Sequence, residues 1–455
     1  MARLGPGQDH AKCPRLDLLL GLLSPAAHQL VNRRNGLLPT KVNDTNNGLT
    51  RRWDRASTIS GPVFGVKWGS MAASGGLHEN PRLGVLDGLR GLAVLLVLWY
   101  HVWEISWLSP PNWLAFLPAT GFVGVTLFFF LSGFVISYPF FRAEALGRPP
   151  PSWGHFAWRR FIKIVPSYVL SIAVAYALGY AQRQPSAALL PDLTTHLLFI
   201  HTWFPDRYGS INGVLWTLSV EVEFYCVFPL IWWAFARRPW LSAGAMIAIA
   251  WMWRAFWAHC CYTTLFGQYE ENLPGYLDIF ALGMLSAHIF VARAHLLRAP
   301  AMRTVAPLIA IAGFVALWLL LADCFNYRLN DQWASVWQID RRPLLGLAFS
   351  AMALGSLASP RWWQILLDNA PMRFLATISY NLYLYHQIVA RELLRHHVPP
   401  FVGDPHYDTQ WQARYTELAF ALAIAVATAV TYLFERPLLR LRGPRGAREP
   451  VKAAT

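Results

Sequence analysis

Two ionisable residues inside one apolar segment are the strongest chemical signal in the sequence. The stretch LDGLRGLAVLLVLWYHVWE at 86–104 carries Arg90 near its beginning and His101 deep in its apolar run. Eleven residues of α-helix make three turns plus about 20°, so both side chains lie on one helix face, roughly 16 Å apart along the axis. An imidazole exchanges protons near neutral pH, and a guanidinium binds phosphate or developing negative charge. The pair therefore predicts proton transfer beside an anion-binding group.

The alternative is that both residues are structural. An arginine at the beginning of a membrane segment is an ordinary positive-inside anchor, and a single histidine is an ordinary hydrogen-bonded packing residue. Ionisable groups inside a membrane segment cost roughly 2.5–3.5 kcal/mol each on insertion scales, however, and their alignment favours a function. With Arg90 at the inner headgroup level, we expect His101 near mid-bilayer, at the end of a cavity that opens inward.

The composition indicates a membrane protein. Of 455 residues, 55% are hydrophobic and only 14% are charged, whereas soluble proteins carry about 25% charged residues. A short segment at 195–204 is predicted to be interfacial or re-entrant because it is too short to span. Ten apolar runs are predicted to span the membrane, near 89–108, 120–140, 164–182, 214–235, 240–259, 275–292, 302–322, 343–359, 374–393 and 415–435. The predicted fold is an all-α polytopic bundle of about ten transmembrane spans.

Charge predicts the orientation of this bundle. The net charge is +14, but the sequence contains no basic–aromatic module of the kind that binds nucleic acid. The positive-inside rule of membrane proteins explains the excess of Lys and Arg. Most Lys and Arg fall in the inner connections if the first span begins inside, which predicts both termini in the cytoplasm.

Residues 1–80 are expected to be a disordered extension or an over-extended gene start, with Met71 as the initiator. Residues 81–440 are the predicted membrane domain, and residues 441–455 a basic cytoplasmic tail.

Metal and cofactor sites are not predicted. The five cysteines form no CxxC pair, so neither a zinc site nor a thioredoxin-like motif is supported.

Two glutamates in the fourth predicted span are further candidates. Glu221 and Glu223 lie 200° apart on a helix, so they do not form a carboxylate pair. At least one must face the bundle interior, since a carboxylate facing lipid is costly. Tyr225, four positions after Glu221, is a potential hydrogen-bond partner. Each glutamate has a functional and a structural interpretation.

Cations and aromatic residues elsewhere are candidates too. Arg160 and Lys163 are expected just before the third span, where they suit the phosphates of a nucleotide-like donor or serve as ordinary inside charge. His386 follows Tyr380 and Tyr383 at helical spacing, so it lines the cavity or belongs to a packing stripe.

Other polar features are expected to be structural. Glu435-Arg436-Pro437 is typical of a helix end with a local ion pair. Four other histidines carry weaker expectations of function: His196, His201, His259 and His288.

Six motifs in order along residues 84–440 resemble the acyltransferase-3 family of integral-membrane O-acyltransferases. The first is VLDGLRGLAVLLVLWYH, in which Arg90 and His101 match the family's Arg, ten residues and His. The second, GVTLFFFLSGFVI at 124–136, places Ser132 in the family's Ser-Gly-Phe motif. The others are WRRFIKIVPSY, LWTLSVEVEFYCVFPL, ISYNLYLYHQIV and FERPLLR.

The resemblance implies an activity and a substrate class. It implies transfer of an acetyl or short acyl group from a coenzyme A thioester to a hydroxyl of a saccharide or lipid-linked glycan, with no bound cofactor, in a bacterial inner membrane. His101 would be the general base or a transient acyl carrier, and Arg90 would hold donor phosphate or stabilise negative charge. The predicted site is His101, Arg90 and Glu221 as catalytic residues, Arg160 and Lys163 at the donor, and Ser132, Tyr383 and His386 lining the cavity.

Three positions depart from the family pattern. Many members carry Asp where Thr126 stands. The basic stretch is Arg160-x-x-Lys163 rather than Arg-x-x-Arg, which keeps the charge but loses a bidentate fork. The residues after Glu221 are Val-Glu instead of Glu-Gln, which leaves Glu221 as the matching acid.

Two other functions fit some of these features. A proton-coupled transporter would use His101 and Glu221 as a relay, although the chain shows no convincing paired halves. A membrane glycosyltransferase is disfavoured because no Asp-x-Asp occurs.

Overall fold

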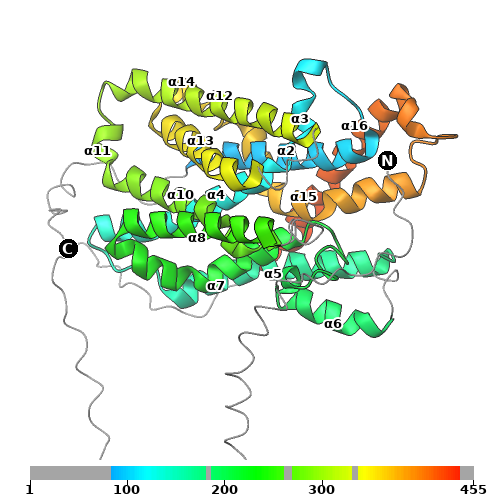
Figure 1. The fold of residues 1–455 in the computed structure, drawn as a ribbon, viewed down its shortest axis with the longest axis horizontal. Coiled ribbons are helices and arrows are strands. Elements are labelled where there is room, and N and C mark those ends of the chain that lie inside the picture. The colour runs from blue at the N-terminus through cyan, green and yellow to red at the C-terminus, as the bar shows by residue number, and fades with distance from the viewer. Residues whose placement is uncertain (1–82, 181–185, 261–268, 330–336, 441–455) are drawn as a thin grey trace, which may run out of the picture.

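The computed structural model describes residues 83–180, 186–260, 269–329 and 337–440, and every regular element in these ranges is a helix (Figure 1). The expectations for residues 1–80 and 441–455 lie outside the described residues. The long helices are α2 (Gly84–Ser106), α4 (Val123–Ala145), α5 (Trp153–Ala177), α6 (Ser186–Leu197), α7 (Trp216–Arg237), α8 (Pro239–Cys260), α10 (Leu273–Ala292), α12 (Met302–Leu329), α13 (Gln338–Ala358), α15 (Ala370–Arg395) and α16 (Thr409–Ala429). The short ones are η2 (Asn112–Leu114), α3 (Phe116–Ala119), η4 (His201–Trp203), α11 (Ala294–Leu297), α14 (Arg361–Gln364), η6 (Pro405–Tyr407), the π-helical η7 (Val430–Glu435) and α17 (Arg436–Leu439).

Eight of the described helices are long and apolar enough to cross a membrane, which confirms an all-α membrane bundle. They are α2, α4, α5, α7, α8, α10, α12 and the continuous run from α16 to α17. The two other predicted spans, α13 and α15, form full-length helices but carry more polar residues, among them Asp340, Arg341 and Arg342 in the first turns of α13. The count of ten spans and the cytoplasmic termini stay predictions.

Helix α5 begins eleven residues before the predicted span. Ser152 caps it, since its hydroxyl accepts a hydrogen bond from the backbone N–H of His155 at 3.3 Å. The expectation that Arg160 and Lys163 precede the third span is therefore wrong. Both lie inside the helix, two to three turns from its beginning, because the capped basic stretch continues the helix without interruption.

Two shorter segments complete the fold. The segment at 195–204 forms the end of α6, a turn and η4, and it buries both His196 and His201. The predicted helix end at Glu435 is wrong, because helical structure passes from α16 through η7 into α17. The π-helical turn at η7 changes the helix phase there and leaves Glu435 3% exposed.

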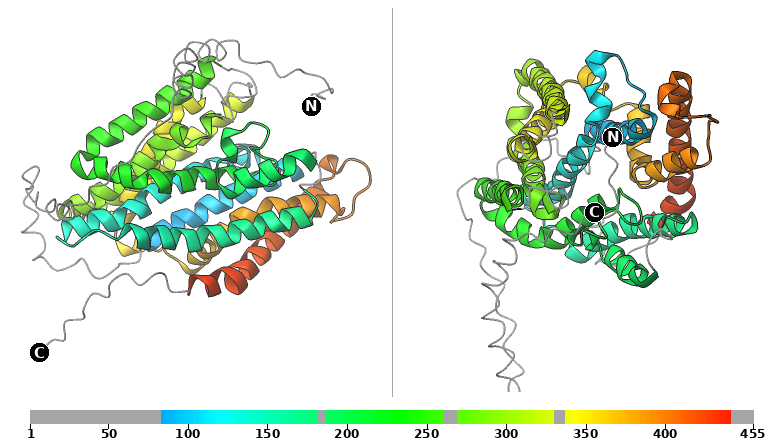
Figure 2. Two further views of the ribbon diagram at one scale, coloured as in Figure 1. Left: turned by 90° about the horizontal axis from the view of Figure 1, so that it is seen from below. Right: turned by 45° about the vertical axis from the view of Figure 1, so that its right-hand side comes forward.

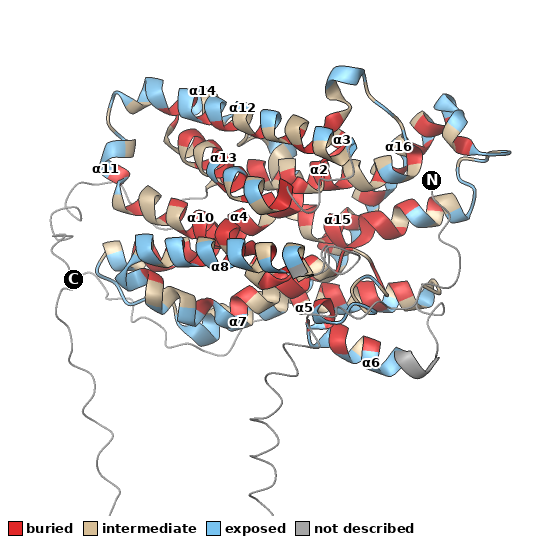
Figure 3. Ribbon diagram, in the orientation of Figure 1, coloured by how far each residue is buried: buried red, intermediate tan, exposed pale blue. Residues whose placement is uncertain are grey.

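Helices α4 and α10 form the centre of the bundle, where burial is greatest (Figure 3). Their backbones approach closely at two glycines. A Cβ on Gly133 would lie 2.4 Å from the carbonyl oxygen of Phe280, and one on Gly283 would lie 2.1 Å from that of Phe130. Only glycine permits this approach, which positions Ser132 beside the crossing.

Helix α2 packs between α4 and α15 (Figure 2). Arg90 lies six residues after its beginning at Gly84, and His101 lies five residues before its end at Ser106. The depth of His101 in the bilayer stays a prediction. Since α2 and α15 run in the same direction, His101 and His386 both lie roughly 24–26 Å along their helices and meet at one level.

Candidate active site

A small cavity between α2, α4, α5, α7 and α15 collects most of the predicted site residues. It has a volume of about 90 Å³, well below the roughly 300–1,000 Å³ of pockets that enclose a drug-sized ligand. Only a small part of a large donor therefore fits inside it. Its lining is Arg90, Val125, Phe128, Phe129, Ser132, Arg160, Lys163, Ile164, Thr217, Leu218, Glu221, Tyr225, Ser379, Tyr380 and Tyr383.

Two guanidinium groups give the cavity its positive charge. Among the described residues, Arg90 and Arg160 have no carboxylate within ion-pair distance. The Arg160 guanidinium lies over the rings of Phe156 and Tyr225, with 5.7 and 5.3 Å between its carbon and the ring centroids. This contact holds the side chain in place without neutralising it. The two arginines therefore remain available for an anionic ligand.

Lys163 also lines the cavity, but its charge is compensated. Its ammonium group forms an ion pair and a hydrogen bond with Glu435. Glu435 in turn accepts a hydrogen bond of 2.7 Å from Asn381 of α15. The local ion pair predicted at Glu435-Arg436 is therefore wrong, because the π-helical turn points Glu435 into the bundle. Lys163 joins α5 to two other helices and supplies less free charge than the sequence indicated.

Glu221 is held on the cavity wall by two hydroxyl groups. Ser132 donates to its Oε1 at 2.7 Å, and Tyr225 donates to the same oxygen, as the spacing predicted. Because both donors bind Oε1, Oε2 keeps its hydrogen-bonding capacity for a ligand. Glu223 faces another way and accepts a hydrogen bond of 2.8 Å from the Trp203 indole. The two glutamates are apart, as their spacing predicted.

His101 contacts His386 rather than the cavity. Nε2 of His386 lies 3.1 Å from Nδ1 of His101, and the rings meet edge to face with centroids 4.8 Å apart. His386 is 1% exposed and does not belong to the lining of the cavity, so that expectation is wrong. The ring of Tyr383, which does line the cavity, lies 5.7 Å from the ring of His386 and separates the two features.

Tyr383 marks the inner end of the cavity nearest the histidines. Its hydroxyl accepts a hydrogen bond from Thr217 at 3.0 Å and donates to the carbonyl of Val214 at 3.1 Å. The loop before α7 therefore anchors this wall. Asn212 of the same loop donates to the carbonyl of Leu384 at 3.0 Å, which ties the loop to α15.

The two residues of the expected transporter relay belong to separate hydrogen-bonded groups in the part of the chain that the structure describes. Glu221 bonds with Ser132 and Tyr225, whereas His101 bonds with His386. No hydrogen bond there joins His101 to Glu221.

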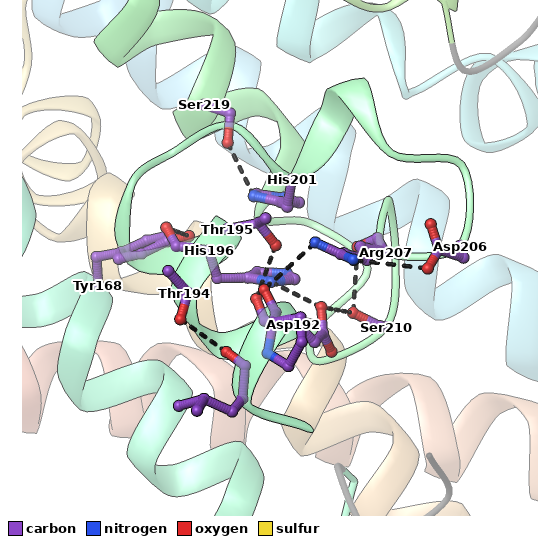
Figure 4. Close-up of polar contacts among 12 residues, drawn as sticks. Tyr168, Asp192, Thr194, Thr195, His196, His201, Asp206, Arg207, Ser210 and Ser219 are labelled. Atoms are coloured by element: carbon purple, nitrogen blue, oxygen red, sulfur yellow. Dashed lines mark hydrogen bonds and ion pairs between the residues drawn. The ribbon is translucent and has the colours of Figure 1, made fainter. Parts of the chain in front are cut away.

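A second buried polar cluster lies in the loop region between α5 and α7 (Figure 4). His196 and His201 stack with ring centroids 3.8 Å apart, Asp192 pairs with His196 at 3.1 Å, and Ser219 contacts His201 at 3.0 Å. Burial and the neighbouring imidazole lower the pKa of His201 to about 2. The His201 ring is therefore neutral, and the cluster fastens the loop that carries Asn212.

Several lining residues were not among the predicted site residues, Thr217, Tyr225 and Tyr380 among them. Thr217 had no signal, because a threonine at a helix start is ordinary. Tyr225 was identified only as a partner of Glu221, and Tyr380 only as part of an aromatic stripe. Tyr380 donates to the carbonyl of Ile164 at 2.8 Å and so joins α15 to α5. Helical spacing from Glu221 and Tyr383 would have placed both tyrosines on the cavity face.

The apolar helical bundle thus contains a positively charged cavity and, beside it, a histidine pair of which His386 is buried. Comparison with protein families specifies the class. A profile of the acyltransferase-3 family, described as an acyltransferase domain, matches residues 83–436. The chain belongs to this family and is an acyltransferase, which confirms the resemblance noted in its motifs.

Curated relatives agree with this assignment. The acyltransferase MdmB of Streptomyces mycarofaciens is 26% identical over 82% of this chain and 95% of its own length. The peptidoglycan O-acetyltransferase OatA of Listeria monocytogenes is 25% identical over 66% of this chain and 48% of its own length. Nodulation protein 10 of Rhizobium leguminosarum bv. viciae is 26% identical over 80% of this chain and 95% of its own length. No solved structure matches the chain.

Proposed function

We propose that the protein transfers an acetyl or other short acyl group from a coenzyme A thioester to a hydroxyl group of a saccharide or lipid-linked glycan. The single observation that carries the proposal is the cavity lined by two uncompensated guanidinium groups, those of Arg90 and Arg160. Arg90 lies on α2, the helix that also carries His101. The protein would act in a bacterial inner membrane, with the donor on the cytoplasmic side.

The positive charge of the cavity supports a coenzyme A thioester as the donor. A coenzyme A thioester carries phosphates on one end and an uncharged acyl group on the other. Arg160 and Arg90 suit the phosphates and the polarised thioester carbonyl, since guanidinium hydrogen bonds to anions are among the strongest in proteins. The narrow cavity admits the thioester arm, and Tyr383 forms the wall between that arm and the histidine pair.

The reaction needs a base for the acceptor hydroxyl. His101 takes the proton of that hydroxyl while its oxygen forms a bond to the thioester carbonyl carbon. The carbon–sulfur bond breaks, and the thiolate of coenzyme A leaves and recovers the proton from the imidazolium. Glu221, with Oε2 unengaged, binds a donor or acceptor N–H or O–H in the cavity.

The acceptor class rests on the relatives. The name of OatA specifies peptidoglycan O-acetylation. BcsY of Komagataeibacter xylinus, named a putative membrane-bound transacylase, is 24% identical over 72% of this chain. The OatA name supports a hydroxyl-bearing glycan as the acceptor, and the BcsY name supports acyl transfer at a membrane.

Membranes containing the protein, incubated with coenzyme A radiolabelled in its acetyl group and an envelope extract, test this proposal. We expect label in the glycan or lipid fraction. Arg160→Gln should raise the donor KM about 10- to 100-fold, the equivalent of the roughly 1.5–3 kcal/mol of a charged hydrogen bond. Arg90→Gln should do the same and also lower kcat.

Arg159 offers a matched control, because it is the exposed neighbour of Arg160 and does not line the cavity. Arg159→Gln should leave the donor KM unchanged. Equal effects of the Arg159 and Arg160 variants would contradict donor binding in this cavity. Absence of label with several acyl donors would reject the acyl-transfer proposal itself.

A further inference from the structure

The hydrogen-bond partners of His386 determine which of its ring nitrogens carries hydrogen. Nδ1 of His386 lies 2.8 Å from the carbonyl oxygen of Tyr383 and 3.0 Å from that of Leu382. Carbonyl oxygens only accept hydrogen bonds, so Nδ1 must be an N–H donor. In the neutral ring, Nε2 of His386 is then an unprotonated acceptor.

The same reasoning passes to His101. Its Nδ1 lies 3.1 Å from Nε2 of His386 and 3.0 Å from the carbonyl oxygen of Val97. Both of these partners are acceptors, so Nδ1 of His101 must be an N–H. The remaining nitrogen of His101, Nε2, therefore carries a lone pair and is the atom able to accept a proton.

We propose that His386 is the positioning residue of the acyl-transfer reaction. Together with the Val97 carbonyl, which accepts from the same nitrogen, it selects the tautomer of His101 in which Nε2 is the base, and it fixes the ring through the Nδ1–H···Nε2 hydrogen bond. This inference rests on the proposed function, and it assigns to His386 a task different from the cavity-lining role that its sequence position indicated.

The reaction takes up and releases the same single proton. Nε2 of His101 takes the acceptor's proton as the acceptor oxygen bonds to the thioester carbonyl. The positive charge of the resulting imidazolium is then shared, because Nδ1–H donates to the unprotonated Nε2 of His386. When the carbon–sulfur bond breaks, Nε2–H of His101 gives the proton to the departing thiolate. His386 gains no net proton.

The burial of His386 explains why an imidazole, rather than a carboxylate, accepts the hydrogen bond from Nδ1–H of His101. His386 is 1% exposed within the bundle, where an ionised carboxylate between turnovers would be costly. A neutral imidazole supplies an acceptor without adding a resident charge. Aromatic neighbours complete the enclosure, since the Tyr100 ring lies 4.9 Å from the His101 ring and the Tyr383 ring lies 5.7 Å from the His386 ring.

Two substitutions of His386 test the role through steady-state kinetics. His386→Leu removes the side-chain acceptor of His101 Nδ1–H and leaves only the Val97 carbonyl, so the ring is no longer held in place. We expect kcat to fall at least about 100-fold with the donor KM within threefold, because acid–base catalysis contributes roughly 10²- to 10⁴-fold. His386→Gln returns a carbonyl acceptor, and it should recover at least tenfold over the Leu variant. His288→Leu, a histidine of α10 that packs against Phe141, is the matched control and should stay within twofold of the unsubstituted protein.

The tautomer is tested without any turnover. Protein labelled with ¹⁵N-histidine in lipid is observed by solid-state NMR, and the His101 and His386 signals are those lost in His101→Gln and His386→Gln. We expect both rings to be protonated at Nδ1 and unprotonated at Nε2, with the two residues coupled across their hydrogen bond. This result would support the inference even if the acyl donor proved to be another compound.

Two results would overturn the inference. One is a His101 ring protonated at Nε2 in the unsubstituted protein. The other is a His386→Leu variant that accumulates normally and keeps kcat within threefold. Absence of all acyl transfer together with the expected tautomers would instead reject the proposed function and leave the histidine pair standing.

Discussion

Replacing Gly133 by alanine tests whether the close crossing of α4 and α10 positions the active site. The added Cβ would lie 2.4 Å from the carbonyl oxygen of Phe280, about 0.6 Å inside the 3.0 Å limit that real Cβ contacts respect. That oxygen belongs to the backbone of a central helix and has no flexible end that can move away. The two helices must therefore separate.

The magnitude follows from overpacking. Inserting a methyl group into a well-packed core costs about 1–3 kcal/mol, which corresponds to a fall in melting temperature of roughly 3–8 °C. Ser132 precedes the glycine, and its hydroxyl lies 2.7 Å from Oε1 of Glu221. A displacement of about 0.6 Å is comparable with the whole range of O–H···O distances, so this hydrogen bond should weaken and activity should fall with stability.

The assay combines thermal unfolding in detergent with the radiolabel assay. Gly283→Ala, with its Cβ 2.1 Å from the carbonyl oxygen of Phe130, should show the larger loss. Gly244→Ala in α8 is the matched control, because a Cβ there meets nothing within 4 Å. It should be neutral or stabilised by up to about 1 kcal/mol through helix propensity. Unchanged melting and activity in Gly133→Ala would refute the reasoning.

Two further predictions concern the ends of α8 and α10. Asp278→Ala leaves the fully buried Arg254 guanidinium without its carboxylate at 2.8 Å, so we expect a loss of about 3–5 kcal/mol, measured as lower melting temperature and abundance; normal melting would contradict it. Burial raises the pKa of Glu271 to about 7, with the Tyr208 hydroxyl and Arg342 opposing that rise. The folded protein therefore binds a proton that the unfolded chain releases near pH 4.5, and stability should fall as pH rises from about 5 to 8. Glu271→Gln should flatten this dependence in melting curves at both pH values, and a slope unchanged by the substitution would exclude Glu271 as its source.

Local features of the chain were predictable because they depend on neighbouring residues. Apolar runs of sufficient length and their breaks predicted ten long helices, each of which the structure contains. The alignment of Arg90 with His101 and the separation of Glu221 from Glu223 follow from the helical repeat alone. The bond from Tyr225 to Glu221 spans four residues of one helix and was predicted for the same reason.

Helix boundaries and phases were less predictable. The beginning of α5 depends on the Ser152 cap, which lies outside the apolar run used to find the span. The direction of Glu435 depends on one π-helical turn that has no signature in the sequence. In both places the structure puts charged residues elsewhere than expected. Arg160 and Lys163 lie inside a helix, and Glu435 lies in the bundle instead of in a local ion pair.

The amino-acid sequence by itself determined the helices, the face that each presents and the family of the protein. Only the tertiary structure decided which faces meet. His101 and His386 are 285 residues apart, and Lys163 and Glu435 are 272 apart. Their contacts depend on how α4 and α10 cross and on how α2 and α15 run alongside each other. Such crossings are decided by packing throughout the bundle, because helices surrounded by lipid associate through close van der Waals contact and interhelical hydrogen bonds. Each side-chain pair forms only where the helix backbones bring it within reach.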